Sequence, residues 1–190
     1  MKTVETANAL PLNHFILTLD KQRIAWLCID VADSLINRLT SDVMQELGLV
    51  LDHLAVHPPA GLIIYSGKDS GFIAGADIDE FSGLNNAGSS LALVARGWKL
   101  FEQIATASYP TLALIQGHCL GGGLELAMAC RYRLAVDQAD TRLSLPEVML
   151  GIFPGWGGIQ RLPRLVGPAA ALDMMLSGRS VNARRAATSG

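Results

Sequence analysis

The sequence predicts an α/β protein with a mostly parallel sheet, and three observations support this fold class. Segments with strand and helix patterns alternate along the chain, which produces βαβ crossovers and parallel strand pairs. The run 62–65 is short and entirely apolar, as expected for a strand that is covered on both faces. Half of the 190 residues are hydrophobic and 17% are charged, which is enough material for the core of one globular domain.

Hydrophobic periodicity places the elements of the first half of the chain. Two β-rich runs flank the polar residues 21–23, which predict a hairpin turn. Apolar residues at helical spacing predict a helix from Ser41 to just before Pro58. The expected elements are strands 14–20 and 24–31, helix 41–57, strand 62–65, a loop over 67–79, a mobile polar stretch over 82–90 and helix 91–104. The inner face of this last helix is expected to contain Leu93, Trp98, Phe101 and Ile104.

The second half continues the alternation. Its expected elements are strand 111–115, a glycine-rich loop over 117–123, helix 124–130, strands 134–136 and 142–145, and helix 168–176. Asn182 is expected to cap one more helix, and the sequence stops at Gly190, where a C-terminal glycine would end that helix. We therefore expect the chain to end at a domain boundary.

Composition narrows the class of partner. The net charge of −2 gives no indication of nucleic acid or an anionic membrane surface as a binding partner. The basic residues Arg179, Arg184 and Arg185 are interpreted as a helix terminus on the surface. The sequence has no signal-peptide pattern and no run of about 18 apolar residues, so no membrane span is predicted. A soluble, cytoplasmic protein is expected.

The cysteines, histidines and clustered acids give no indication of a metal centre. Cys28, Cys119 and Cys130 are scattered, and we expect them to be reduced, buried thiols. The four histidines lack HExxH or clustered spacing. The acids of 77–80 lack the remaining ligands of a calcium loop and are interpreted as a solvated helix start. No metal ligand is predicted.

The first candidate site is the run Gly121-Gly122-Gly123, which is followed by Glu125. Glycines at a strand-to-helix junction let a ligand approach free backbone N–H groups, and the helix dipole favours an anion there. Glu125 lies three residues after Gly122, so its carboxylate is expected to face the same space. A tight turn with an acidic residue favoured by the dipole fits this motif equally well. The spacing excludes a GxGxxG fingerprint and a Walker motif.

The second candidate site is the small-residue loop 71–78, with the sequence GFIAGADI. It follows the strand 62–65, so it is expected at a carboxyl edge of the sheet, where ligands of α/β folds bind. Its backbone can supply a second N–H donor to the same ligand.

The third candidate is Glu147, a lone glutamate after proline in LPEVMLG. We expect it to be buried among Leu145, Val148 and Leu150, which would raise its pKa as a proton donor near neutral pH requires. A helix-start glutamate favoured by the dipole is the alternative. Two carboxylates around one anion site can add water across an activated double bond, since one deprotonates the water and the other protonates the adjacent carbon.

Four spaced motifs, taken together, resemble the crotonase (enoyl-CoA hydratase/isomerase) superfamily from about residue 14 to the last residue. They are IAGADI (73–78), QGHCLGGGLELAMAC (116–130), LPEVMLGIFPGWGG (145–158) and QRLPRLVG (160–167). The sequence is most similar to the N-terminal hydratase domain of multifunctional fatty-acid oxidation proteins. The resemblance implies the crotonase-like fold of repeated ββα units with surrounding helices. It also implies one domain over residues 1–190 that stops before the family's C-terminal helices.

The resemblance further implies roles for individual residues. The N–H groups of Ala76 and Gly122 would form an oxyanion hole for the thioester carbonyl, with Glu125 as base and Glu147 as proton donor to the α-carbon. Coenzyme A is part of the acyl-CoA substrate, and no separate cofactor is implied. The residues expected to line the substrate path are Ala74, Gly75, Asp77, Ile78, Gly121, Pro146, Gly155 and Trp156.

Trp156 stands where many members of the superfamily have a small residue, so the acyl pocket is expected to be reshaped. The presence of both glutamates favours hydration of an enoyl-CoA in fatty-acid β-oxidation. Δ3-Δ2 isomerisation, another crotonase reaction and a non-catalytic acyl-CoA-binding fragment are the alternatives. The resemblance implies a homo-oligomer of the trimer type or, in a full-length protein, a complex with a thiolase subunit.

Overall fold

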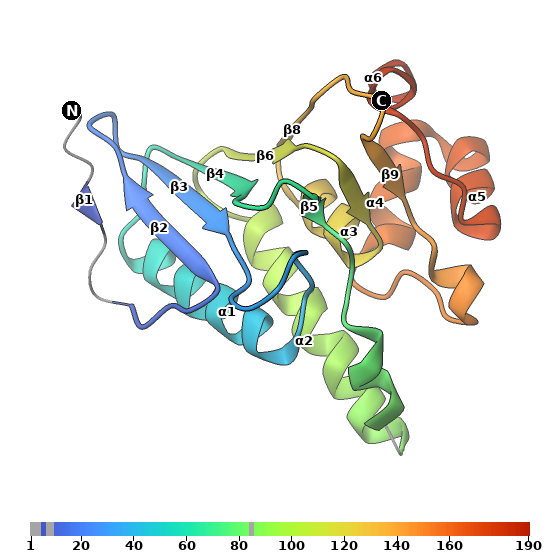
Figure 1. Ribbon diagram of the computed structural model, residues 1–190, viewed down its shortest axis with the longest axis horizontal. Helices are drawn as coiled ribbons and strands as arrows, with labels where there is room; N and C mark the ends of the chain where they lie inside the picture. Colours follow the sequence, from blue (N-terminus) through green and yellow to red (C-terminus); the bar gives the residue numbers. More distant parts are fainter. Residues whose placement is uncertain (1–4, 7–9, 84–85) are drawn as a thin grey trace.

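The computed structural model describes residues 5–6, 10–83 and 86–190. Two sheets and the helices packed around them make up the fold (Figure 1). The larger sheet has six strands in the order β1-β2-β3-β4-β6-β8, and the smaller has three in the order β5-β7-β9. Among the strands of the described residues, the pairs β1/β2 and β2/β3 are antiparallel, and the other pairs are parallel. The predicted α/β class with a mostly parallel sheet is therefore confirmed.

The large sheet contains the predicted hairpin and strands, but the expectation that 62–65 is covered on both faces was wrong, because Leu62 and Ile64 are buried while Ile63 and Tyr65 are only partly buried. Its strands are β1 (Glu5–Thr6), β2 (Phe15–Leu19), β3 (Ile24–Ile29), β4 (Gly61–Ser66), β6 (Thr111–Ile115) and β8 (Tyr132–Ala135). The turn between β2 and β3 places Arg23 at φ 62°, and Oδ1 of Asp20 accepts hydrogen bonds from the N–H groups of Gln22 and Ile24. These side-chain hydrogen bonds are typical of an Asp that organises a tight turn.

Helices α1 (Ser41–Val56) and α2 (Ala87–Ala105) lie side by side against the sheets (Figure 1). Thr40 caps α1 by accepting a hydrogen bond from Val43 N–H at 3.2 Å. The apolar residues of α1 that recur at helical spacing are all buried, as predicted: Val43, Leu47, Val50, Leu51 and Leu54. Beyond them the chain adds α3 (Gly122–Ala129), α4 (Gly158–Val166), α5 (Pro168–Ser177) and α6 (Ala183–Ser189), together with the 3-10 turns η1 (Ile78–Gly83) and η2 (Glu147–Leu150).

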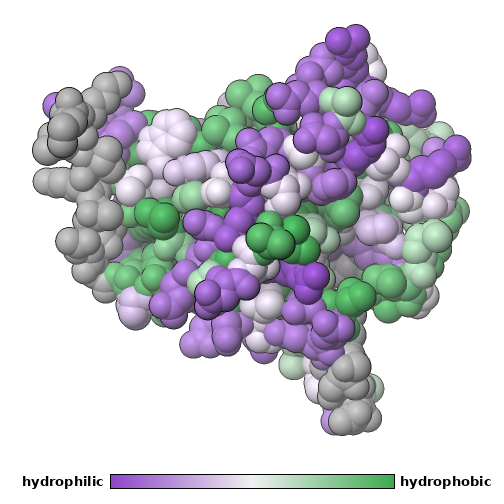
Figure 2. Space-filling model, in the orientation of Figure 1, coloured by the Kyte–Doolittle hydropathy of each residue, from purple (hydrophilic) through white to green (hydrophobic). Residues whose placement is uncertain are grey.

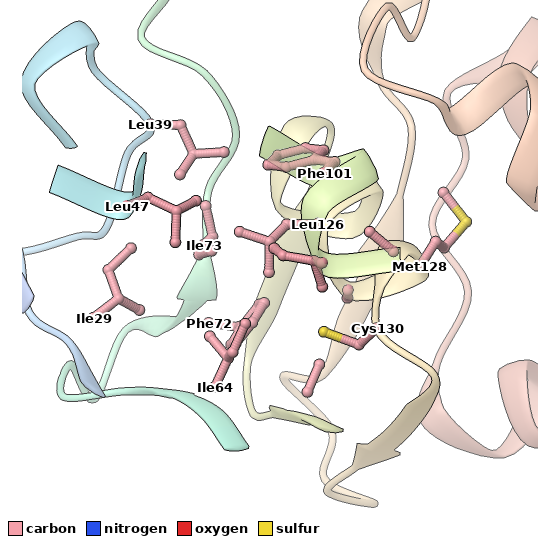
Figure 3. Close-up of a cluster of buried hydrophobic side chains, with 14 of the residues drawn as sticks. Ile29, Leu39, Leu47, Ile64, Phe72, Ile73, Phe101, Leu126, Met128 and Cys130 are labelled. Atoms are coloured by element: carbon pink, nitrogen blue, oxygen red, sulfur yellow. The ribbon is translucent and has the colours of Figure 1, made fainter. Parts of the chain in front are cut away.

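One hydrophobic core joins the two sheets to the helices. Figure 3 shows side chains from different layers that meet there, including Leu47 of α1, Ile64 of β4, Phe72 of β5, Phe101 of α2 and Leu126 of α3. Each of these side chains is at most 2% exposed. Helix α3 lies deepest, and all eight of its residues are buried.

The three-residue strands of the small sheet were not predicted, apart from β9 (Arg142–Ser144). The segments expected as loops over 67–79 and 117–123 contain β5 (Gly71–Ile73) and β7 (His118–Leu120). Strands this short show no periodicity of their own. They form because β7 pairs in parallel with both β5 and β9 in the folded chain.

Three predictions about helices were wrong. Helix α2 begins at Ala87 rather than at position 91, and Asn86 caps it by accepting a hydrogen bond from Ser89 N–H. Residues 87–90 of the stretch expected to be mobile are therefore helical. Residues 84–85 of that stretch lie outside the described part of the chain. Helix α3 begins at Gly122 rather than at position 124. Trp98 is 37% exposed rather than internal, while Gly97 and Leu100 are buried beside the correctly predicted Phe101 and Ile104.

The surface gives no indication of a bilayer-spanning segment. Within residues 5–6, 10–83 and 86–190, no helix is long and apolar enough to cross a membrane. On the face drawn in Figure 2, hydrophilic and neutral residues predominate, and the hydrophobic residues form separate clusters.

Candidate active site

The N-terminus of α3 lies unusually close to the end of β5. An ideal Cβ on Gly123 would be 2.5 Å from the carbonyl oxygen of Ile73, and Gly121 adopts a φ of 51° that favours glycine. A side chain at either position would push the helix away from the strand or strain the backbone. The glycine run is therefore needed for the close approach, and it exposes the first N–H groups of α3 beside β5.

The loops that follow β5 and β7 lie next to each other. An ideal Cβ on Gly121 would be 3.9 Å from Cα of Gly75, and one on Gly75 would be 3.4 Å from the carbonyl oxygen of Leu120. Parallel pairing of β5 with β7 brings their carboxyl ends to the same edge. The predicted loop 71–78 and the glycine run therefore meet, as expected from the sequence.

The backbone of Ala76 is oriented by a parallel bridge to Leu39. Leu39 N–H donates to the oxygen of Gly75 at 2.9 Å, and Asp77 N–H donates to the oxygen of Leu39 at 3.3 Å. In such a bridge the central residue's own N–H points away from the partner strand. The Ala76 N–H therefore points away from Leu39, and this orientation is compatible with an oxyanion donor.

Glu125 lies in the first turn of α3 and is 2% exposed. Its Oε1 accepts two backbone hydrogen bonds, from Trp156 N–H and Gly158 N–H, each at 2.8 Å. Burial raises the pKa of this carboxyl to about 7, against the lowering effect of the Gly158 hydrogen bond; the nearby Glu147 carboxylate raises the pKa further. A carboxyl with this pKa can accept and release a proton near neutral pH.

Glu147 is the first residue of η2 and is 8% exposed. Burial raises its pKa above the usual range, as predicted. Within the described residues, its Oε2 is the buried side-chain oxygen that has no hydrogen-bond partner. A buried oxygen of this kind is costly unless it has a function, because it has lost its hydration without compensation.

The expected environment of Glu147 was wrong in two of three residues. Leu145 is fully buried, but Val148 is 37% exposed and Leu150 is 53% exposed. Gly121 lies beside the Glu147 carboxyl instead, since an ideal Cβ on Gly121 would be 2.9 Å from Oε1 of Glu147. The carboxyl is thus buried against the glycine run, beside the same backbone that carries the candidate oxyanion donors.

Trp156 is buried between α2 and α3. Its indole ring occupies the space that side chains at Gly97 and Gly122 would need, and an ideal Cβ on Gly122 would be 2.6 Å from its Cζ3. The ring also packs edge-to-face against Phe101, with 5.7 Å between the centroids. Trp156 therefore lies directly against Gly122, at the N-terminus of α3.

The other predicted substrate-path residues lie in different surroundings. Ala74 lines a hollow of about 220 Å³ together with Leu120. An ideal Cβ on Gly155 would be 3.6 Å from the side chain of Val94 in α2, and Ile78 is 53% exposed. Asp77 accepts a hydrogen bond from Asp79 N–H. Pro146 lies close to Gly178, since an ideal Cβ on Gly178 would be 3.5 Å from the Cα of Pro146.

The expectation of a solvated helix start over 77–80 was wrong for Glu80. Its carboxylate accepts hydrogen bonds from the backbone N–H and the hydroxyl of Ser41, at 2.9 and 2.8 Å, at the first residue of α1. Within residues 5–6, 10–83 and 86–190, no group of three or more metal-ligating side chains is present. A hollow of about 380 Å³ between α4, α5 and α6 contains neither Glu125 nor Glu147.

Asn37 is a further buried polar residue near the site, only 2% exposed, and the sequence gives no sign of its role. Its Oδ1 accepts from Val31 N–H, and its Nδ2 lies within 3.0 Å of the oxygens of Ile29, Ser66 and Phe72. Its backbone oxygen accepts from Ala74 N–H at 2.8 Å. A lone Asn beside Ile36 in a polar loop carries no periodic signal, and only the fold shows that it holds the loop before Ala76.

Comparisons with known proteins agree with this geometry. Residues 25–190 match the enoyl-CoA hydratase/isomerase family. The chain is 45% identical to the fatty acid oxidation complex subunit alpha of Vibrio cholerae over 176 residues, which are 92% of this chain and 25% of that protein. It is also 44% identical to the corresponding subunit of Vibrio campbellii, over 90% of this chain and 25% of that protein. The chain thus spans about a quarter of the length of these relatives.

Solved structures give the same result. An enoyl-CoA hydratase of Geobacillus kaustophilus superposes with a TM-score of 0.90 at 28% identity, covering 99% of this chain and 69% of that one. An enoyl-CoA hydratase of Bacillus anthracis superposes with a TM-score of 0.84 at 29% identity, covering 94% of this chain and 68% of that one. The fold is crotonase-like, and the chain belongs to the enoyl-CoA hydratase/isomerase family.

Proposed function

We propose that this chain is an enoyl-CoA hydratase that adds water across the 2,3 double bond of a trans-2-enoyl-CoA in fatty-acid β-oxidation. The observation that carries the proposal is the pair of buried carboxyls with raised pKa, Glu125 and Glu147, beside the glycine run. The names of the relatives above support the substrate class. Coenzyme A enters as part of the substrate, and the proposed reaction requires no metal or redox cofactor.

The proposed mechanism assigns one proton transfer to each glutamate. The N–H groups of Ala76 and Gly122 donate to the thioester oxygen and stabilise the enolate that develops during attack. Ionised Glu125 takes a proton from water as the water oxygen bonds to C3. Protonated Glu147 delivers a proton to C2, so the two carboxyls exchange protonation states and the product is the 3-hydroxyacyl-CoA. Proton exchange with solvent then restores both groups.

The unpartnered Oε2 of Glu147 favours isomerisation as a second candidate activity. A single carboxyl can remove a proton from C2 of a 3-enoyl-CoA and return it to C4, using the same oxyanion hole. Hydration of trans-2-enoyl-CoA and conversion of 3-enoyl-CoA are separated by their products. An E125Q variant that loses hydration but keeps isomerisation would support this second activity.

The test of the proposed function is the loss of enoyl-thioester absorbance when crotonyl-CoA is added to the protein. We expect activity in the native chain and a fall of about 10²–10⁴-fold in E125Q and E147Q, which keep side-chain size but remove proton transfer. Losses below tenfold in both variants would overturn the mechanism. Acyl-CoA binding without turnover in the native chain would instead support a non-catalytic acyl-CoA-binding unit.

Partners and location are part of the same proposal. The relatives are named as alpha subunits of a complex, which supports a complex with a thiolase subunit for a full-length protein and a trimer-type homo-oligomer for this domain. A cytoplasmic location fits this assignment. Light scattering coupled to size-exclusion chromatography measures the mass, and a monomer at micromolar concentration would contradict the homo-oligomer.

A further inference from the structure

The hydrogen bonds that hold Glu125 come from one short turn. Trp156 N–H and Gly158 N–H both donate to its Oε1 at 2.8 Å. Between them lies Gly157, whose φ of 115° is a backbone conformation that favours glycine. With glycine at 155, 157 and 158, this turn has little intrinsic rigidity, so the position of Glu125 depends on what fixes the turn.

Arg161, in the first turn of α4, fixes it. Its Nη1 donates to the carbonyl oxygen of Trp156 at 2.9 Å, and its backbone N–H donates to the oxygen of Gly157 at 2.8 Å. The guanidinium also covers Gly157 so closely that a Cβ there would collide with Nη1. Arg161 therefore contacts both peptide units between the two amides that hold Glu125.

The same guanidinium is anchored on α2. Its Nη2 forms a 2.9 Å ion pair with Oε2 of Glu102, and its Cζ lies 5.4 Å from the ring centroid of Trp98. The Arg161 side chain is only 12% exposed, whereas that of Glu102 is 49% exposed. Planar geometry with several donors lets one arginine make all of these contacts, which a lysine cannot do.

We propose that Arg161 is a positioning residue for the reaction: it ties the Trp156–Gly158 turn to α2 and so fixes the carboxylate of Glu125. The inference rests on the proposed function, because it assigns Glu125 the role of base. Two charged groups act on the Glu125 carboxyl from the elements around it, Glu147 of η2 and Arg161 of α4. Glu147 raises the pKa of Glu125, whereas Arg161 lowers it. Replacing Arg161 therefore removes the lowering effect and leaves the raising effect of Glu147.

The test compares R161M and R161K with R164M, a matched control on the exposed side of α4. We expect R161M to lower kcat by about tenfold to a hundredfold, with KM for crotonyl-CoA changed less than threefold. The acidic limb of the pH profile of kcat should move to higher pH. R161K should fall between R161M and the native protein, and R164M should match the native protein.

A double-mutant cycle separates positioning from a general structural effect. If Arg161 acts through Glu125, R161M should change the residual rate of E125Q less than twofold, because the group it positions is already disabled. A further loss of tenfold or more in the double variant would overturn the proposal, as would an unmoved acidic limb in a folded R161M protein. Circular dichroism establishes that each variant is folded.

A readout without turnover keeps this inference distinct from the proposed function. The side-chain carboxyl of Glu125, labelled with ¹³C, can be titrated by NMR, with E125Q used to assign its signal. R161M should raise the measured pKa of Glu125 even in a protein that proved inactive toward crotonyl-CoA. An unchanged pKa would overturn the role of Arg161 whatever the activity, whereas a shifted pKa without hydration would reject only the proposed function.

Discussion

The indole ring of Trp156 fills the space beside Gly122 that any side chain at position 122 would occupy, 2.6 Å from an ideal Cβ. The two residues come from different elements, and the same ring also excludes a side chain at Gly97 of α2. Gly122 therefore leaves room for the tryptophan, and its N–H is the one that we propose as an oxyanion donor.

This contact predicts compensation between positions 122 and 156. G122A should destabilise the protein by about 1–3 kcal/mol, because it forces an extra methyl group against a packed ring. W156A should be destabilising alone, since it leaves a cavity. In the double variant the added methyl group occupies space that the indole ring has left. The loss of unfolding free energy in the double variant should therefore be smaller than the sum of the losses in G122A and W156A. Urea denaturation measures the three values, and strict additivity would contradict the contact.

The raised pKa of Glu125 predicts a pH dependence of stability. Its pKa in the folded protein is about 7 against an ordinary value of 4.5, so the folded state binds this proton more tightly than the unfolded state. The contribution to stability is fully present below pH 4.5 and is lost as pH rises through 7. The free energy of unfolding should therefore fall by up to about 1.4 kcal/mol per pH unit in that interval.

The E125Q variant checks this assignment, because glutamine does not titrate. Its stability should depend less steeply on pH than that of the native protein between pH 4.5 and 7. Activity should show the opposite trend: hydration by the native protein should increase through pH 7 as Glu125 ionises. An equal slope in the two proteins would mean that another group titrates.

The unpartnered oxygen of Glu147 predicts a separation of stability from activity. Its burial without a hydrogen bond is unfavourable, so replacement by an uncharged group of similar shape should cost little. We expect E147L to have a melting temperature equal to or above that of the native protein while hydration is lost. Thermal unfolding followed by circular dichroism tests this expectation, and a fall of 5 °C or more would contradict it.

The hydrogen bonds of Asn37 predict a stability effect and an activity effect at one position. N37A leaves several buried groups without partners, each costing about 1–3 kcal/mol, and should destabilise the protein by at least about 2 kcal/mol. Activity should also fall, because the variant loses the hydrogen bond from Asn37 Nδ2 to the oxygen of Phe72 in β5, the strand that leads to Ala76. Ser70 is a suitable control: its hydroxyl donates to Leu35 O in an exposed position, and S70A should change neither property appreciably. Equal stability of N37A and S70A would contradict the role given to Asn37.

Much of the fold followed from residues close together in sequence. The periodic apolar residues of α1 and the cap at Asn182 were predicted, and Asn182 accepts a hydrogen bond from Arg185 N–H as a cap does. The three cysteines are free and buried, as expected. These features depend on local periodicity and capping chemistry, which a single sequence contains.

The motifs likewise identified Glu125 and Glu147, and the expected rise in the pKa of Glu147 is confirmed in direction. What the sequence could not supply was the set of neighbours. Burial of Glu147 against Gly121, the exposure of Trp98 and the pairing of β5 with β7 all depend on residues distant in the chain.

The sequence by itself thus determined the fold class, the family and the two carboxyls, because periodicity and motif spacing are local properties. Only the tertiary structure decided that Trp156 lies against Gly122 and that Arg161 reaches from α4 to Glu102 of α2 while holding the turn that binds Glu125. The physical reason is that hydrogen bonds and packing act over a few ångströms. The residues that tune a carboxyl are therefore those that folding brings beside it, whatever their separation in sequence.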